Sequence, residues 1–296
     1  MLKLLVNKIK PNSEKTKLRS LKLQCKNTIT TMLAFCKKYS VRHCILVIGQ
    51  PESGKSTLCA QAGTLLFSSI ENTTANEFIF EIYLKNNALF LHVPQGFFLF
   101  SDTILQQDAW SFLATCFKHH RTSLPITRCV ICIDIHDFLT RSLISNETRL
   151  AQISLALNIF ANKVKSPIEI SLFFTKADLL TGFNEFFDHQ NKEYLEQPWG
   201  IYLRAFPEDN FINTEFDQLI KKLNEQLLWR IHHEVHMENV YLIKSFPIIM
   251  ETTKQKMQEN IPKFLAQWAK KKLLIPAELY LISCRQYREL NRVQRV

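Results

Sequence analysis

Short apolar runs alternate with longer stretches in which apolar residues recur every three or four positions along this chain of 296 residues. A short run bounded by turn signals predicts a buried strand, whereas the longer period predicts a helix that buries one face. Strands are predicted at 44–48, 78–84, 88–93, 129–135, 168–175 and 279–283. Helices are predicted at 14–40, 55–67, 103–119, 147–164, 214–236 and 251–271. This alternation predicts an α/β fold with a mainly parallel sheet flanked by helices.

Two local features add detail to this pattern. Asn86 and Asn87 separate the second and third predicted strands by two residues that favour a tight hairpin turn. The first predicted helix has one apolar stripe, formed by Leu18, Leu21, Cys25, Ile29, Met32 and Cys36. Its lysines lie mostly off that stripe, so the helix is expected either to dock on the body as an ordinary surface helix or to lie close to a membrane.

Charge is distributed unevenly along the chain. The formal net charge is +10, yet residues 1–43 hold eleven basic residues and one acid, and residues 263–296 hold eight basic residues and two acids. The span 44–262 is left with a net charge of −6, which makes it a poor surface for nucleic-acid phosphates. With 46% hydrophobic and 22% charged residues, we expect a globular chain without a nucleic-acid partner.

Several further classes of segment and site are not expected. The most apolar long window, 88–105, is interrupted by polar residues and a proline, so no transmembrane helix is expected there. The segment 2–9 is too short and too polar for a signal peptide. Cys129 and Cys132 form a CxxC without a second pair at metal spacing, so buried reduced thiols are expected there. The histidines at 232–236 lack the HExxH spacing of a zinc site.

A phosphate-binding loop follows the first predicted strand. The residues are Gly49, Gln50, Pro51, Glu52, Ser53, Gly54, Lys55, Ser56 and Thr57, which match GxxxxGK[ST] in full. In such a loop the glycines let backbone N–H groups point at phosphate oxygens, and the next helix directs its positive end at the same anion. Lys55 is expected to reach the β- and γ-phosphates, and the Ser56 hydroxyl is expected to bind Mg²⁺.

A base-recognition loop follows the predicted strand 168–175. Thr175, Lys176 and Asp178 match the [NT]KxD element of GTPases, in which the Asp carboxylate accepts two hydrogen bonds from guanine and the Lys stem covers the ring. A four-residue pattern carries little information alone. Its place after a strand, about 120 residues beyond a phosphate loop, makes it a candidate site for GTP or GDP.

These residues together suggest a family. The stretch 174–200, FTKADLLTGFNEFFDHQNKEYLEQPWG, resembles the TK-x-DLL-x-GF-x-EFF … Q-x-WG signature of the N-terminal cytoplasmic domain of IcmF/TssM proteins. Those are inner-membrane components of bacterial type VI and type IVB (Dot/Icm) secretion systems. Further similarities lie at 137–139, 245–247 and 279–283. The resemblance implies a P-loop NTPase fold like that of small GTPases, and it places Ser283 in the last nucleotide-binding motif.

The chain departs from the family in the third motif, which resembles DTAG. The equivalent run is Val93-Pro94-Gln95-Gly96, so Gly96 is retained as a nucleotide-binding candidate and the Asp is replaced by Val93. Since valine binds neither water nor metal, Mg²⁺ would be held by Ser56 and the phosphates, and efficient hydrolysis is not expected. Asp134, at the end of the run VICID, is an alternative metal ligand if its strand lies beside the phosphate loop.

The resemblance and the charge pattern predict four segments. These are a basic helical segment at 1–43, a P-loop core at 44–206, a helical insertion at 207–276, and the last core strand with a basic tail at 277–296. The termini lie where the family's polypeptide enters and leaves the membrane. We therefore expect the protein in the cytoplasm, peripheral to the bacterial inner membrane, with its basic termini on anionic lipid.

Three functions remain open at this point. The first is a structural or regulatory domain that binds GTP or ATP with Mg²⁺, hydrolyses it weakly or not at all, and contacts other inner-membrane or baseplate subunits of a secretion system. The second is an active Mg²⁺-dependent GTPase switch. The third is a truncated structural remnant with an empty pocket.

Overall fold

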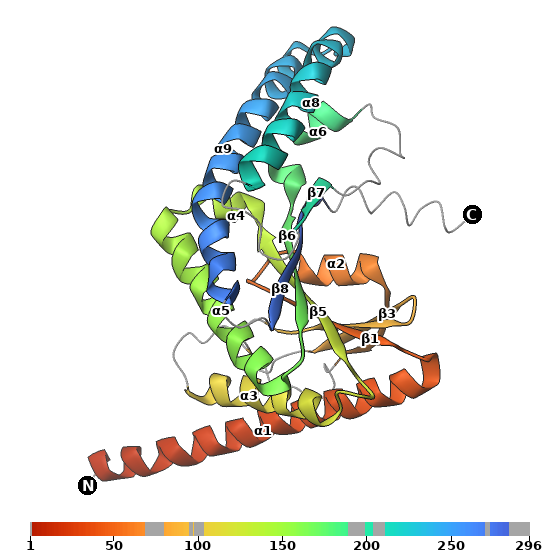
Figure 1. Cartoon of the computed structure of the whole chain (residues 1–296). Helices are drawn as coiled ribbons and strands as arrows, with labels where there is room; N and C mark the ends of the chain where they lie inside the picture. Colours follow the sequence, from red (N-terminus) through yellow and green to blue (C-terminus); the bar gives the residue numbers. More distant parts are fainter. Residues whose placement is uncertain are drawn as a thin grey trace.

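The computed structural model describes residues 2–68, 80–94, 97, 104–188, 199–203, 211–269 and 273–283, with only the backbone described at 2–15. One eight-stranded sheet forms the centre of the molecule, in the order β2-β3-β4-β1-β5-β6-β8-β7 (Figure 1). The strands are β1 (His43–Gly49), β2 (Thr64–Ser68), β3 (Glu81–Lys85), β4 (Ala88–His92), β5 (Ile126–Asp134), β6 (Ile168–Thr175), β7 (Trp199–Tyr202) and β8 (Leu274–Leu281).

The sheet is parallel through its middle and antiparallel at both ends. β4, β1, β5, β6 and β8 run parallel, whereas β2, β3 and β4 form an antiparallel meander and β7 pairs antiparallel with β8. Asn86 and Asn87 both have positive φ, at 46° and 63°, as a type I′ hairpin turn requires. The predicted parallel α/β class and the hairpin are therefore confirmed.

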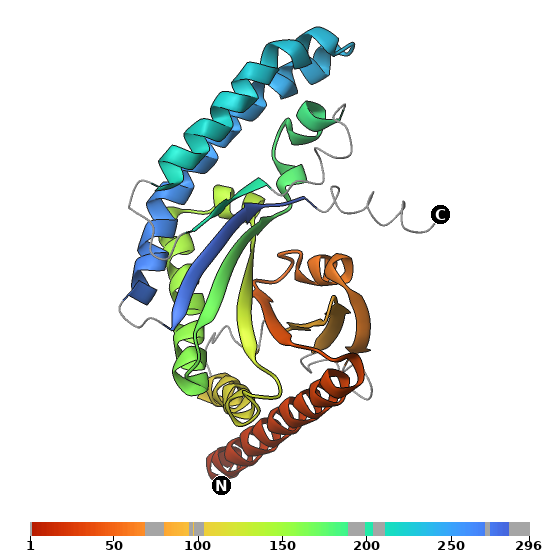
Figure 2. The same ribbon diagram turned by 45° about the vertical axis from the view of Figure 1, so that its right-hand side comes forward.

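Helices lie on both faces of the sheet (Figure 2). They are α1 (Leu2–Tyr39), α2 (Lys55–Ala62), α3 (Ile104–His119), α4 (Ile135–Thr140), α5 (Leu143–Val164), α6 (Phe183–Phe187), α8 (Phe211–His233) and α9 (Met237–Ala269), with a 3₁₀ turn η2 (Ala177–Leu179). α2 covers one face with a small apolar cluster. The larger core fills the other face, where α3, α5 and α9 pack and α1 crosses α3.

Buried indole groups join the helices of the larger core. Trp110 of α3 donates to the Ala156 carbonyl of α5 at 2.8 Å, and Trp268 of α9 donates to Ser154 Oγ at 3.0 Å. Both indoles are fully buried, so each N–H has the partner that burial demands. The predicted apolar stripe of the first helix is also confirmed, because Leu21, Cys25, Ile29 and Met32 are buried.

α8 and α9 form a helical hairpin that projects beyond the sheet (Figure 1). α6 anchors this hairpin, since the rings of Phe183, Phe186 and Phe187 all lie within 5.7 Å of the Phe246 ring in α9, measured between centroids. The residues GFNEFF of the family-like signature thus form an aromatic contact between the core and the hairpin. Aromatic pairs at these separations add about 0.5–1.5 kcal/mol each beyond the area they bury.

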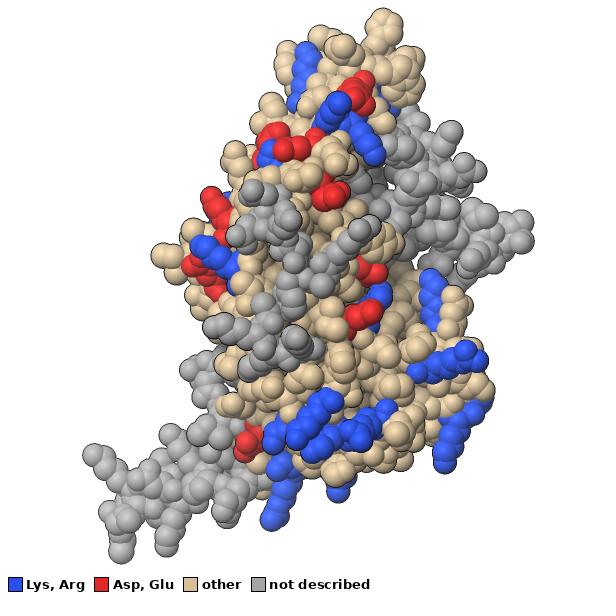
Figure 3. All heavy atoms as spheres, in the orientation of Figure 1, with Lys and Arg blue, Asp and Glu red and all other residues tan. Residues whose placement is uncertain are grey.

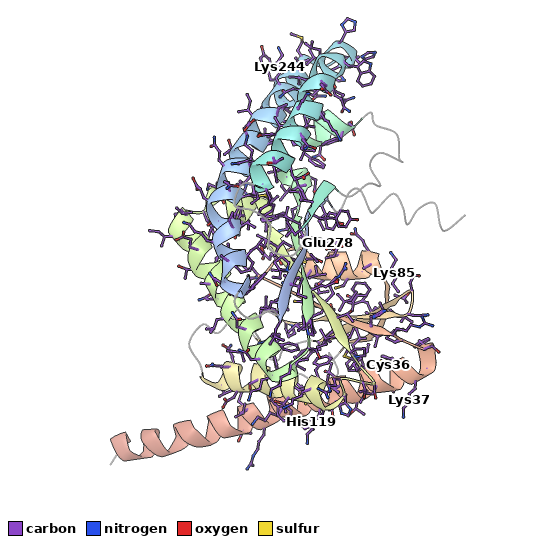
Figure 4. All side chains as sticks on the ribbon, in the orientation of Figure 1. Cys36, Lys37, Lys85, His119, Lys244 and Glu278 are labelled. Carbon is purple, nitrogen blue, oxygen red and sulfur yellow. The ribbon has the colours of Figure 1, made fainter. Side chains whose placement is uncertain are left out.

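On the face of the sheet that carries α2, opposite charges link β5, β6 and β8, which lie to one side of that helix. Glu278 of β8, labelled in Figure 4, accepts hydrogen bonds from Arg128 Nη1 of β5 at 3.0 Å and from Ser171 Oγ of β6 at 2.8 Å. Arg128 also donates from Nη2 to Glu169 Oε2 at 2.7 Å. These contacts are cross-strand pairs within a sheet, so each contributes a few tenths of a kcal/mol to about 1 kcal/mol.

Several predicted boundaries were wrong. The helix expected at 14–40 begins at Leu2, and the strand expected at 279–283 spans Leu274–Leu281. The helix expected at 55–67 ends at Ala62, and β2 follows at Thr64. Gly63 separates them because a Cβ there would lie 2.5 Å from the Leu84 carbonyl oxygen of β3. The helix expected at 251–271 begins at Met237 instead, since Pro247 and Pro262 lie inside α9 without ending it. The short elements α4, α6 and β7 were not predicted.

Gly63 provides a test of the packing between α2 and β3. Replacing Gly63 with Ala should lower the urea unfolding midpoint and cost about 1–3 kcal/mol, because the new methyl group must displace backbone of β3. The control is Ala60→Ser on the exposed side of α2, which should change stability by no more than about 0.5 kcal/mol. Equal midpoints for both variants would contradict the close approach.

Candidate functional site

The loop between β1 and α2 curls around a buried ammonium group. Ser53 donates to the Gln50 carbonyl through Oγ at 2.8 Å and through its backbone N–H at 3.4 Å. Lys55 Nζ donates to the same Gln50 carbonyl and to Ser53 Oγ, the latter at 3.3 Å. Lys55 is only 7% exposed, and this burial lowers its pKa to about 8. The loop therefore holds a desolvated cation at its centre.

The end of this loop is open to an anion. Gly54 is the residue before α2 and has φ 75°, a left-handed conformation that glycine adopts without cost, and no side chain caps the helix. The first amide groups of α2 are thus left for a ligand, which is the usual anion site of a helix N-terminus. Pro51, Glu52, Ser56 and Thr57 are exposed, so both hydroxyl groups can be reached from solvent.

A hydroxyl group connects the second predicted loop to the first. Thr175, the last residue of β6, is buried, and its Oγ1 lies 2.8 Å from the Ser53 carbonyl and 3.2 Å from the Ile133 carbonyl. β1, β5 and β6 are adjacent and parallel, so their carboxyl ends meet at one edge of the sheet. Thr175 thus joins the phosphate loop to the loop that contains Lys176 and Asp178.

Asp178 and Ser283 are in direct contact, as members of one binding site should be. Ser283 is buried and donates from Oγ to Asp178 Oδ1 at 2.7 Å. The backbone reinforces this contact, because the N–H of Ala177 donates to the Ile282 carbonyl at 3.0 Å. Oδ2 of Asp178 has no hydrogen-bond partner among the described residues. The hydroxyl group therefore orients the carboxylate and leaves one oxygen for a ligand.

Asp134 lies where the metal hypothesis requires, but its carboxylate already has partners. β5 pairs with β1, so its end is adjacent to the phosphate loop. Lys176 Nζ donates to Asp134 Oδ2 at 2.7 Å, and the backbone N–H of Asp137 donates to Oδ1 at 3.1 Å. Asp134 thus caps α4 and pairs with the Lys176 ammonium group. Its role as a metal ligand remains a prediction.

A charged network that the sequence did not predict joins the phosphate loop to α5. Arg149 Nη1 donates to the Gln50 side-chain oxygen and to Asp137 Oδ2, each at 2.5 Å. Arg141 donates to Asp137 as well, and these two guanidinium groups, Arg141 first, hold the pKa of Asp137 below its ordinary value. No local pattern marks Arg149, since it lies on a helix 99 residues after Gln50.

The third-motif region is only partly described. Gly96 lies outside the described residues. Val93 is buried in the larger core with Leu89 and Leu91, so its side chain points away from α2. The side chain that faces the α2 side of β4 near its end is His92, which lies 2.8 Å from Glu81 Oε2 through Nδ1. No sequence motif includes this pair.

Two weak metal-binding patterns of the sequence, the CxxC pair and the histidine run, both lie within the described residues. Cys129 packs in the larger core and Cys132 in the cluster under α2, because residues three apart in a strand lie on opposite faces. The prediction of buried thiols is confirmed for this pair. In the histidine run, α8 ends at His233, and Glu234 accepts hydrogen bonds from His236 N and Asn239 Nδ2. Within the described ranges no three metal-ligating side chains form a cluster.

Lys55 yields a prediction on stability. Lys55→Met should raise the free energy of unfolding at pH 7 by about 1–3 kcal/mol, because folding wild type buries a charge that methionine lacks. Since folding lowers the pKa of Lys55, wild type gains stability as pH rises from about 8 towards 10.5, and the advantage of the variant should shrink across that range.

The measurement is urea unfolding at pH 7 and at a pH of about 9.5, inside the window where the lysine titrates. Lys222→Met, on the exposed surface of α8, is the matched control and should leave stability within about 0.5 kcal/mol of wild type at both pH values. A Lys55→Met variant that is less stable than wild type at pH 7 would mean that the lysine's two hydrogen bonds outweigh the cost of its burial.

Comparison with known proteins identifies relatives of this chain. A family model described as the IcmF-related N-terminal domain matches residues 105–295. The chain is 26% identical over 223 residues to the type VI secretion system component TssM1 of Pseudomonas aeruginosa. That alignment covers 68% of this chain and 20% of the relative, so the chain spans about a fifth of that protein's length.

Solved structures resemble the fold at low sequence identity. A mutant of S. thermophilus NFeoB bound to GDP is 10% identical, with a TM-score of 0.32, and the match covers 78% of this chain and 98% of that one. The small COPII coat GTPase SAR1 of Encephalitozoon cuniculi, in complex with GDP, is 12% identical with a TM-score of 0.29, covering 66% and 67%. With its loop and mainly parallel sheet, the chain has the predicted P-loop, GTPase-like fold.

Proposed function

Because this chain belongs to the IcmF-related N-terminal domain family, we propose that it is a nucleotide-binding structural or regulatory domain of a type VI or type IVB secretion apparatus. In this proposal it binds GTP or GDP in preference to ATP, hydrolyses GTP slowly or not at all, and contacts other inner-membrane or baseplate subunits. The bound nucleotide would bias the loops that face those subunits. The supporting observation is the contact of Ser283 with Asp178 beside the phosphate loop.

The phosphate side of the site suits a nucleoside diphosphate or triphosphate. Lys55 would exchange its contacts with Gln50 and Ser53 for phosphate oxygens, and the uncapped amides at the start of α2 would bind the same anion. Lys55 would also recover charge stabilisation that its burial removes in the free protein. Glycine at 54 keeps the backbone open for close approach of the phosphates.

The base side of the site suits guanine. Guanine presents two adjacent N–H donors, and a carboxylate with one oxygen held by Ser283 is a matching acceptor. Adenine presents an acceptor where guanine has the ring N–H, so the same carboxylate would oppose it. Thr175 and Lys176 would position this carboxylate, the first through the Ser53 carbonyl and the second through Asp134.

The metal side is compatible with Mg²⁺ through the exposed hydroxyl of Ser56. When bound, the cation would neutralise charge on the phosphates. Val93 supports slow hydrolysis, because its side chain is buried in the core and offers no oxygen to the metal or its water. The active-switch alternative needs Asp134 or another group to complete the metal site, and the two oxygens of Asp134 are already bound by Lys176 and the start of α4.

A titration with fluorescent nucleotide analogues tests the site. Lys55→Ala should abolish detectable binding, and Asp178→Asn should weaken guanine nucleotides about 10- to 100-fold, since a charged hydrogen bond is worth about 1.5–3 kcal/mol. Asp178→Asn should leave any weak ATP binding unchanged. Asp108→Asn, an exposed carboxyl on α3, is the control and should bind as wild type does.

Each outcome selects one function. Wild-type affinity in Lys55→Ala, or no binding by wild type, would support the structural remnant with an empty pocket. Equal losses for GTP and ATP in Asp178→Asn would contradict the guanine assignment. We expect single-turnover hydrolysis at the rate of the nucleotide alone, and a clear acceleration would favour the active switch.

Membrane association is the second part of the proposal. Among the described residues no helix combines the length and hydropathy that crossing a bilayer requires. A basic band instead covers the lower surface in Figure 3, over α1 and α3. Exposed basic residues of α1, of the end of α3 and of the turn that follows it are Lys17, Arg19, Lys26, Lys37, Lys38, Lys118 and Arg121. Lys37 and His119 are labelled on this side in Figure 4. We propose that this band contacts anionic lipid at the cytoplasmic face of the inner membrane.

Vesicle co-sedimentation tests this contact. Lys26→Glu with Lys37→Glu should weaken binding to phosphatidylglycerol vesicles at least about tenfold, because each basic residue near such a surface contributes about 1 kcal/mol. Lys221→Glu with Lys222→Glu on α8 makes the same charge change away from the band and should have little effect. Binding that is equal for neutral vesicles, or equally reduced in both variants, would contradict the proposal.

A further inference from the structure

Glu81 and His92 lie at the same edge of the sheet as the phosphate loop, although neither belongs to a recognised motif. His92 is the last residue of β4 and pairs in register with Val47 of β1, two residues before Gly49. Glu81 is the first residue of β3 and lies directly opposite His92 in the antiparallel pair. Strand pairing alone therefore places both residues beside the start of the phosphate loop.

Both side chains face the α2 side of the sheet. β4 alternates, with Leu89, Leu91 and Val93 in the larger core and Phe90 against the cluster under α2. His92 has the parity of Phe90, so it shares that face. Val93, which aligned with the missing acid of the third motif, lies on the opposite face. The residue that the fold presents to the α2 side at this point is His92.

The spacing along α2 places Ser56 level with this pair. Gly63 lies against Leu84 of β3, and Cys59 packs with Tyr83, so α2 and β3 run in the same direction. From Gly63 back to Ser56 the helix rises about 10 Å. From Leu84 back to Glu81 the strand covers about 10 Å as well. Ser56 of α2 and Glu81 of β3 therefore lie at about the same level along the strand direction.

Charge effects agree with this placement. Burial is the main cause of the raised pKa of the Cys59 thiol, and the Glu81 carboxylate raises it further, whereas the Lys55 ammonium lowers it. Cys59 thus lies within electrostatic range of both groups. Glu81 is the first residue of β3 and Lys55 is the first residue of α2, so both charges lie near the start of this helix.

The geometry of the pair fixes the histidine tautomer. Glu81 Oε2 lies 2.8 Å from His92 Nδ1 and accepts from the Tyr83 hydroxyl at 3.1 Å. Because this oxygen already accepts from the Tyr83 hydroxyl, it is an acceptor, and Nδ1 faces it as the donor. Nε2, the other ring nitrogen, has no partner among the described residues. A carboxylate on one nitrogen with the other nitrogen open is the arrangement of metal-binding histidines.

We propose that His92, oriented by Glu81, binds through Nε2 a divalent cation that also contacts the Ser56 hydroxyl and the nucleotide phosphates. The pair would take the part of the acid that the third motif lacks. An imidazole ligand makes the site favour Mn²⁺ over Mg²⁺, because Mg²⁺ prefers oxygen ligands alone. This inference rests on the proposed nucleotide binding.

The experiment measures nucleotide affinity and metal coordination together. For wild type, a fluorescent GDP analogue should bind at least about tenfold more tightly with Mn²⁺ than with EDTA, and more tightly than with Mg²⁺. His92→Gln should lose the Mn²⁺ enhancement and keep the wild-type affinity in EDTA. Glu81→Gln should weaken the affinity for Mn²⁺ about 10- to 100-fold, because it removes the partner that orients the His92 ring. His43→Gln, at the far end of β1, is the control.

Pulsed electron paramagnetic resonance of the Mn²⁺–GDP complex gives a direct readout. Wild type should show nitrogen coupling from one imidazole, and His92→Gln should not. Wild-type metal dependence in His92→Gln, or no nitrogen coupling in wild type, would overturn this inference and leave nucleotide binding intact. No nucleotide binding by wild type, with Mn²⁺ or with EDTA, would overturn the proposed function and this inference together.

Discussion

The parallel pairing of β1 with β5, and of β5 with β6, is the constraint on which the candidate site depends. Carboxyl ends of adjacent parallel strands open at one edge of a sheet, so the loops that follow them must meet there. Pairing of β8 beside β6 brings Ser283 to the same edge, 105 residues after Asp178. The Thr175 hydroxyl then joins two of the loops through the Ser53 carbonyl. Without this register the three predicted motifs would be unconnected segments.

Sequence patterns were sufficient for the parts of the fold that local physics determines. The strand, glycine loop and helix around Lys55 are one continuous segment, and the run at 168–175 ends at Thr175 as predicted. The boundaries that failed depend on distant contacts. Gly63 ends α2 because β3 lies against it, and α9 continues through Pro247 because α6 and α8 pack along it. Packing against neighbours overrode local propensity in both cases.

The residues of the site that the sequence did not reveal are brought together by contacts between distant segments, so no local sequence pattern marks them. Arg149 reaches Gln50 from a different helix, and Glu81 meets His92 only through the hairpin register. Val93 occupies the third-motif position in the sequence, one residue from the side chain that faces α2. A shift of one residue along a strand moves a side chain to the other face, so an alignment cannot decide such a case without the strand register.

In the free protein, burial of charged groups at this site costs folding free energy, and this cost differs from one group to the next. Lys55 is buried and desolvated with only a carbonyl and a hydroxyl as partners, whereas the Asp137 and Glu81 carboxylates each have a charged or hydrogen-bonding partner. Among these three groups, Lys55 at the phosphate loop is the one without an oppositely charged partner in the described part of the chain. Uncompensated burial of a charge is tolerated where a ligand supplies the missing partner. An abandoned pocket would be free to replace Lys55 with an apolar residue and gain stability, so the presence of this desolvated lysine argues for an anion that binds there.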